Sequence, residues 1–438
     1  MTLKKIFPVL SVTLLLTGVL SLTLRIPQVK ATGTIYINAD GSIDPPIASG
    51  YIQRNGDQYT FTSNIHGSII VERDNIVVDG AGYTLQGIGN GTGISLDGRS
   101  NVTVRNVKIR EFYHGIAIYY SSNINIYRNE IEDNDLLTHR ADGIYLVRSS
   151  NNMISGNRIE NNGDGIEFDA HSSNNTIIRN KIANNYEGID LWYSSHNTIS
   201  ENNVTSNNWD GIELFFSSNN IISENNIMAN YYDGIKISNS SHNTIHGNTM
   251  TNNGKGVEFK DSSSNNVFSR NKIIATSHSI YLDIQSNNNT FFGNKIKNSK
   301  YGVSLKLSSN NMFFYNYFSN ITIQATCHQS SNLWDNDCEG NYWSDCKGED
   351  SDGNGIKDTP HVINEENQDN YPLKHPYVDA NYDGQVNIID LTCVAKAYGT
   401  NLGDPKYNSH ADIDWNDTVN IIDISICASW FEYKWAHP

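Results

Sequence analysis

The sequence is poor in the residues that build a compact core. Hydrophobic residues occupy only 38% of its 438 positions, and there are 9 prolines. A compact domain of this size needs a larger apolar fraction, whereas a disordered chain would have fewer than the 24 tyrosines and 14 phenylalanines found here. A repetitive fold satisfies both observations, because each repeat contributes only a thin layer of core.

Positive charge and cysteine are also scarce. The sequence has 31 basic against 47 acidic residues, a net charge of −16, which argues against a nucleic-acid partner because such binding needs a basic face. Five cysteines leave one unpaired in any set of disulfides. Cys327, His328, Cys338 and Cys346 form the one Cys/His cluster, for which a disulfide is favoured over a metal site.

Only the N-terminus has a long apolar run. Lys4 and Lys5 precede the nearly uncharged segment 6–24, which is typical of an export signal. The segment Val29-Lys30-Ala31 is a poor cleavage site, so residues 1–31 are either a signal peptide or an uncleaved N-terminal anchor. No later segment could span a bilayer. We therefore expect a secreted or cell-surface protein, with a membrane contact only through such an anchor.

The sequence is rich in asparagine, serine and glycine, and these residues recur at a fixed interval. A glycine followed by a β-branched residue repeats about every 23 residues, with Ser279 in one vacant slot; the glycines are Gly93, Gly115, Gly143, Gly165, Gly188, Gly211, Gly234, Gly256 and Gly302. Each repeat holds short alternating strands and turns too short for a crossover helix. Such units wind into a parallel β-helix of about ten or more coils, stacked ~4.8 Å apart.

The repeat predicts two apolar ladders inside the coil. These are Ile166, Ile189, Ile212, Ile235, Val257, Ile280 and Val303, and Phe168, Leu191, Leu214, Ile237, Phe259, Leu282 and Leu305. A recurrent asparagine predicts a third, polar ladder with a structural role, because stacked amides bond along the axis. Extra residues within 133–141 predict a bulge on one face.

The C-terminal part is acidic and has the spacing of calcium loops. Oxygen ligands at loop positions 1, 3, 5, 7, 9 and 12 wrap around Ca²⁺. One loop has Asp379, Asn381, Asp383, Gln385, Asn387 and Asp390, and a second has Asp412, Asp414, Asn416, Thr418, Asn420 and Asp423. Asp417 replaces the usual glycine of the second loop, and Asp tolerates the left-handed backbone. Helical patterns follow each loop, over 391–398 and 424–433.

An earlier acidic loop is incomplete. Asp350, Asp352, Asn354 and Asp358 have the spacing of calcium ligands, but His361 falls at position 12, so the loop is either a calcium site closed by another ligand or a plain polar loop.

The paired loops resemble dockerin domains over residues 377–435, which implies a cohesin-like partner and bound Ca²⁺. Ile388-Ile389 and Ile421-Ile422 occupy the positions that read the partner, and they are either docking residues or core. The body, residues 34–373, resembles the NosD-type right-handed β-helix family, grouped with carbohydrate-binding and sugar-hydrolase β-helices. That resemblance rests on residues 78–85, the coils, and residues 340–345 and 358–360, and right-handedness comes from it.

The family name implies copper, whose sites favour converging His, Met and Cys. Here His196 and His242 lie two coils apart, or about 10 Å. The five methionines are scattered, so copper delivery is disfavoured.

Acidic and aromatic residues gather on the outer face of the coils between Gly143 and Gly256. Glu167, Asp190 and Glu213 are the candidate catalytic carboxylates, and Trp192, Tyr193, Phe215 and Phe216 are candidate sugar-stacking residues. A lyase would also need a base, such as Lys236 or Arg140. Alternatively, these carboxylates form a solvated surface that prevents aggregation.

The sequence thus predicts four parts: residues 1–31, the β-helix over 32–333 with an irregular N-terminal cap, a C-terminal cap over 334–375, and the dockerin-like domain over 377–435. The leading hypothesis is an exported β-helix protein that binds a polysaccharide or surface glycan and docks to a cohesin-like partner. A polysaccharide hydrolase or lyase, and a non-catalytic structural or adhesion protein, are the alternatives.

Overall fold

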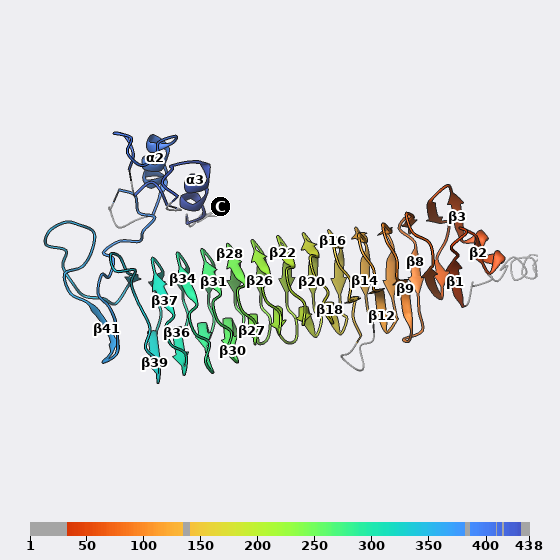
Figure 1. Ribbon diagram of the computed structural model, residues 1–438, viewed down its shortest axis with the longest axis horizontal. Coiled ribbons are helices and arrows are strands. Elements are labelled where there is room, and N and C mark those ends of the chain that lie inside the picture. Colours follow the sequence, from red (N-terminus) through yellow and green to blue (C-terminus); the bar gives the residue numbers. More distant parts are fainter. Residues whose placement is uncertain (1–32, 135–140, 382–385, 409, 414–415, 431–438) are drawn as a thin grey trace, which may run out of the picture.

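The chain forms a long solenoid of parallel strands, with a small helical module beside one end (Figure 1). The computed structural model describes residues 33–134, 141–381, 386–408, 410–413 and 416–430. The solenoid has about 12 turns, as the repeat predicts. Its handedness stays a prediction.

Three sheets run along the solenoid, and nearly all neighbouring strands in them are parallel. The first sheet, called sheet A, contains β2 (Ile43–Asp44), β1 (Thr34–Ile37), β6 (Ser68–Val71), β9 (Thr92–Asp97), β12 (His114–Tyr119), β15 (Ile144–Val147), β18 (Asp164–Asp169), β21 (Glu187–Trp192), β24 (Ile212–Phe215), β27 (Asp233–Ser238), β30 (Lys255–Lys260), β33 (His278–Leu282), β36 (Tyr301–Lys306) and β39 (Ile323–His328). Only β1 and β2 pair antiparallel in it.

Sheets B and C complete each coil with shorter strands. Sheet B contains β3 (Ile52–Asn55), β4 (Gln58–Phe61), β7 (Val77–Asp79), β10 (Thr103–Arg105), β13 (Asn125–Tyr127), β16 (Met153–Ser155), β19 (Thr176–Ile178), β22 (Thr198–Ser200), β25 (Ile221–Ser223), β28 (Thr244–His246), β31 (Val267–Ser269), β34 (Thr290–Phe292) and β37 (Met312–Phe314). Sheet C contains β5 (Ile65–His66), β8 (Thr84–Gln86), β11 (Lys108–Arg110), β14 (Glu130–Glu132), β17 (Arg158–Glu160), β20 (Lys181–Ala183), β23 (Asn203–Thr205), β26 (Asn226–Met228), β29 (Thr249–Thr251), β32 (Lys272–Ile274), β35 (Lys295–Lys297), β38 (Tyr317–Ser319) and β40 (Tyr342–Trp343).

The interior of the coil holds the two predicted apolar ladders. Ile189 pairs with Ile166 on one side and Ile212 on the other, and all three are fully buried. Alternation of apolar and polar residues along each strand puts these side chains on the inner face. The predicted ladders are confirmed.

The asparagines form buried amide ladders at the corners between strands. Asn225 donates from its side chain to Asn248 Oδ1 at 2.9 Å and to the Ile199 carbonyl at 2.9 Å, and Asn202 repeats this bonding with Asn225 one coil earlier. Each amide also accepts the backbone N–H of the preceding asparagine in the ladder, as Asn225 does from Asn202 at 2.9 Å. Because unpaired buried amides are costly, this confirms the structural role of the repeated asparagine.

The recurrent glycine is explained by the close approach of neighbouring coils. A Cβ on Gly188 would lie 2.3 Å from the carbonyl oxygen of Gly211, well inside van der Waals contact. The backbone there does not have a positive φ, so space rather than conformational freedom selects glycine.

Both ends of the solenoid are closed by irregular structure. The first coils include the short 3₁₀ helix η2 (Pro46–Gly50) and the antiparallel pair β3 and β4. At the other end, the hairpin of β41 (His361–Asn364) and β42 (Asn367–Asp369) lies over the last coils, where Trp334 and Trp343 are buried. All five cysteines are free. The expected disulfide is not formed: Cys327 lies on β39 of sheet A, Cys346 follows β40 of sheet C, and Cys338 is exposed.

The C-terminal module has a separate small core and two helices, α2 (Ile388–Ala397) and α3 (Ile421–Ser429). Both helices begin three residues earlier than the sequence pattern suggested. Asn387 and Asn420 are N-caps, and Asp390 and Asp423 complete capping boxes with them. These boxes satisfy the free N–H groups of the first turn and so start each helix directly after its loop.

Lys295 attaches this module to the side of the solenoid. Its ammonium, on β35, donates to the carbonyl of Trp430 at 3.0 Å and lies over the Trp430 ring. Tyr317 and Tyr377 also pack against Trp430. The module is therefore held against sheet C and leaves sheet A uncovered (Figure 1).

Candidate functional site

The outer face of sheet A carries two columns of residues, all acidic except Lys236, and together they are here called the acidic stripe. The first column is Asp142, Asp164, Glu187, Asp210 and Asp233, and the second is Glu167, Asp190, Glu213, Lys236 and Glu258. Strand register aligns them, since Asp164 pairs with Glu187 while Glu167 pairs with Asp190 and Asp190 with Glu213. The three predicted catalytic residues thus lie side by side on β18, β21 and β24.

The acidic stripe is largely buried. Asp142, Asp190 and Asp210 are 0%, 5% and 1% exposed, and Glu187 and Glu213 are also buried. The interpretation of these carboxylates as a solvated surface is therefore wrong. Coils ~4.8 Å apart place the side chains of each column in contact with one another, so that they cover their neighbours.

Burial and mutual repulsion raise the pKa of several of these groups. Burial, aided by the charges of Asp142 and Asp164, raises the pKa of Glu167 to about 9. Burial, aided by Glu213 and Asp164, raises the pKa of Glu187 to about 10. The pKa of Asp164 and of Asp210 rises only to about 6, again mainly through burial. Neighbouring groups with well-separated pKa values are typical of functional sites.

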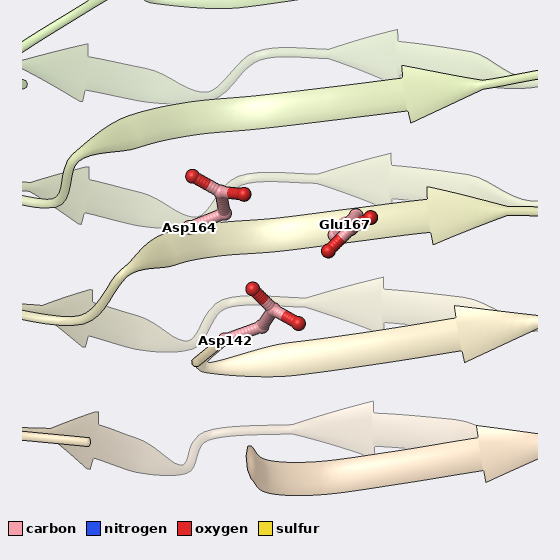
Figure 2. Close-up of side chains that lie close together, drawn as sticks. All are labelled: Asp142, Asp164 and Glu167. Atoms are coloured by element: carbon pink, nitrogen blue, oxygen red, sulfur yellow. The ribbon is translucent and has the colours of Figure 1, made fainter. Parts of the chain in front are cut away.

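Within the part of the chain that the structure describes, two triads of carboxylates have their oxygens within 4.8 Å of one another. One is Asp142, Asp164 and Glu167, here called the first triad, whose side chains lie close together on two neighbouring coils (Figure 2). The second triad is Glu187, Asp210 and Glu213. Asp142, Asp164, Glu187 and Asp210 each directly precede a repeat glycine, but they were not among the predicted site residues. Their fixed position before the glycine is the sequence signal that could have found them.

The two triads differ in their neighbours. Lys236 lies 2.9 Å from Glu213 Oε1 and 3.3 Å from Asp210 Oδ2 in the second triad. Burial alone would lower the pKa of Lys236, but Glu213 and Asp210 raise it above its ordinary value. In the first triad, His114 Nδ1 lies 3.0 Å from Asp142 Oδ2, and burial lowers the pKa of His114 to about 4. Among the residues that the structure describes, no lysine or arginine forms an ion pair with the first triad.

Asp190 lies between the triads. Its side chain is in register with Glu167 on one side and Glu213 on the other, and its buried Oδ1 has no hydrogen-bond partner. Burial, aided by the charge of Glu187, raises its pKa well above the ordinary value. Of the two bases considered for a lyase, Lys236 contacts the second triad, whereas Arg140 lies outside the described residues.

Aromatic side chains flank the acidic stripe on both sides. Trp192 and Phe215 pack with ring centroids 4.6 Å apart, and Tyr193 stacks on Phe216 at 5.0 Å. A second ladder precedes the strands and consists of Tyr186, Trp209 and Tyr232, which the sequence places near the candidate sugar-stacking residues. Trp192, Tyr193, Phe216 and Tyr232 are each about 40% exposed, which leaves ring faces available to a ligand.

The helical module holds buried carboxylates at both predicted calcium loops. Asp379 and Asp390 are buried, and Asp390 accepts the N–H groups of Asn381 at 3.2 Å and Asn387 at 2.7 Å. Asp412 and Asp423 are buried equivalently in the second loop. Asp417 has a φ of 63°, the left-handed value expected for its position. This donor set fits Ca²⁺, since all its groups are oxygens directed into short loops.

Some of the predicted ligands lie outside the described residues, namely Asp383, Gln385 and Asp414. The remaining ones are Asn381 and Asn387 in the first loop, and Asn416, Thr418 and Asn420 in the second. Asn420 accepts the N–H of Ile422 at 2.8 Å, so its side-chain oxygen caps α3.

The earlier acidic loop is folded by internal hydrogen bonds. Asp350 accepts the N–H groups of Asn354 at 3.0 Å and Gly355 at 3.2 Å, and Lys374 lies 3.4 Å away. Desolvation alone would raise the pKa of Asp350, but these hydrogen bonds and Lys374 hold that pKa below its ordinary value. Asp352 bonds to Asn354 in the same way, and Asp358 accepts from Ser351. The loop stays a prediction as a calcium site.

Four isoleucines at the start of α2 and α3 are exposed. Ile388 and Ile389 are 64% and 52% exposed, and Ile421 and Ile422 are 60% and 48% exposed. The alternative that they form core is therefore wrong. Both pairs occupy the same place after an N-cap asparagine, so each loop presents an equivalent apolar surface.

A cavity of about 130 Å³ lies where the module meets the solenoid, lined by Tyr315, Leu373, Tyr377 and Ile413 among others. It contains no residue of the acidic stripe, so the stripe and the junction are separate features.

Fold and sites together define a parallel β-helix protein with a calcium-loop docking module. The family described as "Periplasmic copper-binding protein (NosD)" matches residues 32–207, 129–299 and 211–348, and the dockerin type I domain matches residues 377–428. The chain belongs to the NosD family and carries a C-terminal dockerin type I domain. A dockerin docks with a cohesin partner and typically binds calcium, and both matches indicate an extracytoplasmic location.

Curated proteins include no match to the chain. Among solved structures, the periplasmic alginate epimerase AlgG is 14% identical, with 68% of this chain and 83% of that chain covered and a TM-score of 0.40. PfbA, a surface adhesin of Streptococcus pneumoniae, is 14% identical over 58% and 81% of the two chains, with a TM-score of 0.42. The catalytic domain of a GH87 α-1,3-glucanase with nigerose is 16% identical over 65% and 63%, with a TM-score of 0.45.

Copper, which the family description names, does not fit the donor groups found here. The metal-competent clusters of the described residues contain only carboxylates, whereas copper favours His, Met and Cys. His196 and His242 are exposed on separate turns, and Cys327, Cys338 and Cys346 do not converge with His328. None of the helices in the described residues is long and apolar enough to cross a membrane.

Proposed function

We propose that this protein binds polysaccharide along the outer face of sheet A and is anchored to a cohesin-bearing partner through its dockerin module. One observation carries the first half of the proposal: two aromatic ladders flank a continuous stripe of carboxylates. Sugar rings offer C–H faces that pack on aromatic rings and hydroxyls that bond to carboxylates.

The regular spacing of the ladders suits a repetitive ligand. Tyr186, Trp209 and Tyr232 stand on three successive coils, and Trp192 and Phe215 stand on two of the same coils. Each coil thus offers a similar set of contacts ~4.8 Å from the next. A glycan chain presents similar groups repeatedly, so several weak contacts add along its length.

The second half of the proposal rests on the exposed isoleucine pairs. Apolar side chains that are about half exposed or more on a small module are typical of an interface, because water contact with them is unfavourable. Ile388 and Ile389 follow the first loop, and Ile421 and Ile422 follow the second. Calcium would hold these loops, and with them the isoleucines, in place.

A second candidate function is hydrolysis or elimination of the same polysaccharide. Its support is the presence of close carboxyls with different proton affinities: the pKa of Glu167 is about 9 and that of Asp164 about 6. At neutral pH, the first is a proton donor and the second largely ionised, which is the division of roles that acid–base cleavage of a glycosidic bond requires.

Binding and turnover on a panel of neutral and acidic polysaccharides test both candidates. We expect Trp192→Ala combined with Trp209→Ala to weaken binding about tenfold or more in calorimetry, since about 1.4 kcal/mol corresponds to tenfold. The matched control is Phe292→Ala, an outward aromatic on sheet B that stacks on Phe314. Equal loss in the control would contradict the assignment to sheet A.

Cleavage products would favour the enzyme, provided that Glu167→Gln, Asp190→Asn or Glu213→Gln abolishes them while binding persists. If the panel shows neither binding nor cleavage, the proposal fails and the structural or adhesion hypothesis replaces it.

Docking is tested with purified cohesin modules in the presence of Ca²⁺. The variant with Ile388, Ile389, Ile421 and Ile422 all changed to Ser should lose binding, whereas Leu402→Ser, an exposed apolar residue of the same module, should retain it. Retained binding by the fourfold variant would place the interface elsewhere.

A further inference from the structure

The first triad brings together carboxylates from two neighbouring coils. Asp142 precedes β15, and Asp164 and Glu167 lie on β18 one coil later. One oxygen of each residue lies within 4.8 Å of one oxygen of the other two, and the three side chains lie close together on the outer face (Figure 2). Asp164 Oδ1 also accepts the N–H of Glu187 on the next coil at 3.2 Å. Carboxylates at such separations repel one another, so without a bound cation Glu167, whose pKa burial and its acidic neighbours raise to about 9, keeps a proton at neutral pH.

Among the described residues, no lysine or arginine forms an ion pair with the carboxylates of the first triad. The other charged groups that act on them are acidic as well, namely Asp169, Glu187, Asp190 and Glu213. The second triad shows what a neutralised arrangement looks like, because Lys236 contacts both Glu213 and Asp210.

Asp142 provides independent evidence of a missing ligand. It is 0% exposed, and its carboxylate oxygens have no partner of good hydrogen-bond geometry; the groups nearest to them are His114, the backbone of Asp164 and the carboxyl of Glu167. His114 Nδ1 lies 3.0 Å from Oδ2, but Oδ1 has no such neighbour. A buried carboxylate oxygen with nothing to bond costs several kcal/mol, so such atoms in folded proteins usually bind a partner.

We propose that Asp142, Asp164 and Glu167 bind a calcium ion on the outer face of sheet A. All three ligands are hard carboxylate oxygens, which favour Ca²⁺ over softer metals. Asp142 closes the buried side of the site, while Asp164 and Glu167 are only half-buried. Water or a ligand oxygen completes the coordination from that side. The site is distinct from the dockerin loops and does not depend on the proposed polysaccharide binding.

Calcium stoichiometry in the full-length chain tests this site. Because the dockerin loops also take calcium, the parent for the test carries Asp350→Ala, Asp390→Ala and Asp423→Ala, which silence the C-terminal loops. After gel filtration in micromolar free Ca²⁺, elemental analysis of this parent should find one calcium per chain. Adding Asp142→Asn or Glu167→Gln should remove it, and Asp169→Asn, an acidic change on the same strand, should leave it bound.

Thermal unfolding gives a second readout. Calcium should raise the melting temperature of the loop-silenced parent and of Asp169→Asn, but not of Glu167→Gln. Because Glu167 is only half-buried, its replacement by Gln should leave the fold intact, so the lost response to calcium would not be caused by misfolding. No retained calcium in the parent, or retention unchanged by both triad variants, would overturn the proposal. Because no polysaccharide is used, failure here is separate from failure of the proposed function.

Discussion

Lys236 Nζ lies 2.9 Å from Glu213 Oε1, one coil away in the same column of sheet A. This contact gives the second triad a cation of its own, whereas no lysine or arginine in the described part of the chain pairs with the first triad. The acidic stripe therefore consists of a part neutralised by the protein and a part that requires protons or an added cation.

Removing that lysine should destabilise the solenoid. Lys236→Met leaves Asp210 and Glu213 buried without a counter-charge, and we expect a loss of about 3 kcal/mol in the free energy of unfolding, measured in urea by circular dichroism. Lys306→Met is the matched control, because its pair with Asp283 is half exposed and should change stability by less than about 1 kcal/mol. Equal stability of the Lys236 variant and the parent would mean that the carboxylates are neutralised by protons.

Stability should fall as pH rises when metal is chelated. The pKa of Glu187 is about 10 in the folded protein against 4.5 ordinarily, so the folded state binds more protons than the unfolded chain between those values. Asp210, with a pKa of about 6, contributes at the lower end of that window. This stabilisation is complete in acid and is lost as pH rises through the folded pKa values.

Urea midpoints in chelator at pH 5, 7 and 9 should therefore decrease in that order. Glu187→Gln should flatten the decrease, whereas Glu201→Gln, in an exposed pair with Arg179, should not. A midpoint that rises from pH 5 to pH 9 would contradict the burial argument.

The amide ladder should be sensitive to a single truncation. Asn225→Ala removes the side-chain donor to the Ile199 carbonyl, one of the two donors to Asn248 Oδ1, and the acceptor of the Asn202 backbone N–H, all in the interior. We expect a cost of about 3 kcal/mol or more in urea unfolding. The adjacent Asn226→Ala removes only an exposed bond to Asn203 and should stay within about 0.5 kcal/mol. Similar effects from both would show that the ladder is not cooperative.

Each dockerin loop should lose calcium independently. Asp390→Ala removes the group that binds Asn381 and Asn387 N–H and completes the capping box of α2, so calorimetry should find one calcium fewer in the C-terminal module. Asp404→Ala, in the segment between the loops, is the control. Unchanged calcium uptake by the Asp390 variant would remove this residue from the ligand set.

Local and periodic features could be predicted from the sequence. The glycine interval fixes the coil, and alternation places residues such as Ile189 and Leu191 inside it. The calcium loops depend on spacing within twelve residues, which the chain itself specifies. The start of α2 could also have been predicted, because Asn387 and Asp390 have the spacing of a capping box. Both residues are also calcium-loop positions, which is why the predicted helix began after them.

Contacts between coils could not be predicted in the same way. Periodicity aligned Glu167 with Asp190 and Glu213, but only the packed structure shows that Asp190 and Glu213 are buried although they point outward, and that half-buried Glu167 lies close to Asp142. The sequence likewise did not decide whether Ile388 and Ile421 are exposed, or whether Cys327 and Cys346 are paired.

The sequence by itself determined a β-helix of repeated coils with a C-terminal calcium-loop module, because both depend on spacings along the chain. Tertiary structure alone decided which carboxylates share a site and which has a lysine beside it, as in Lys236 with Glu213. The physical reason is that the burial and the charge of each carboxyl group depend on the side chains of adjacent coils and on the aromatic rings beside them. The repeat interval does not specify how these side chains cover one another.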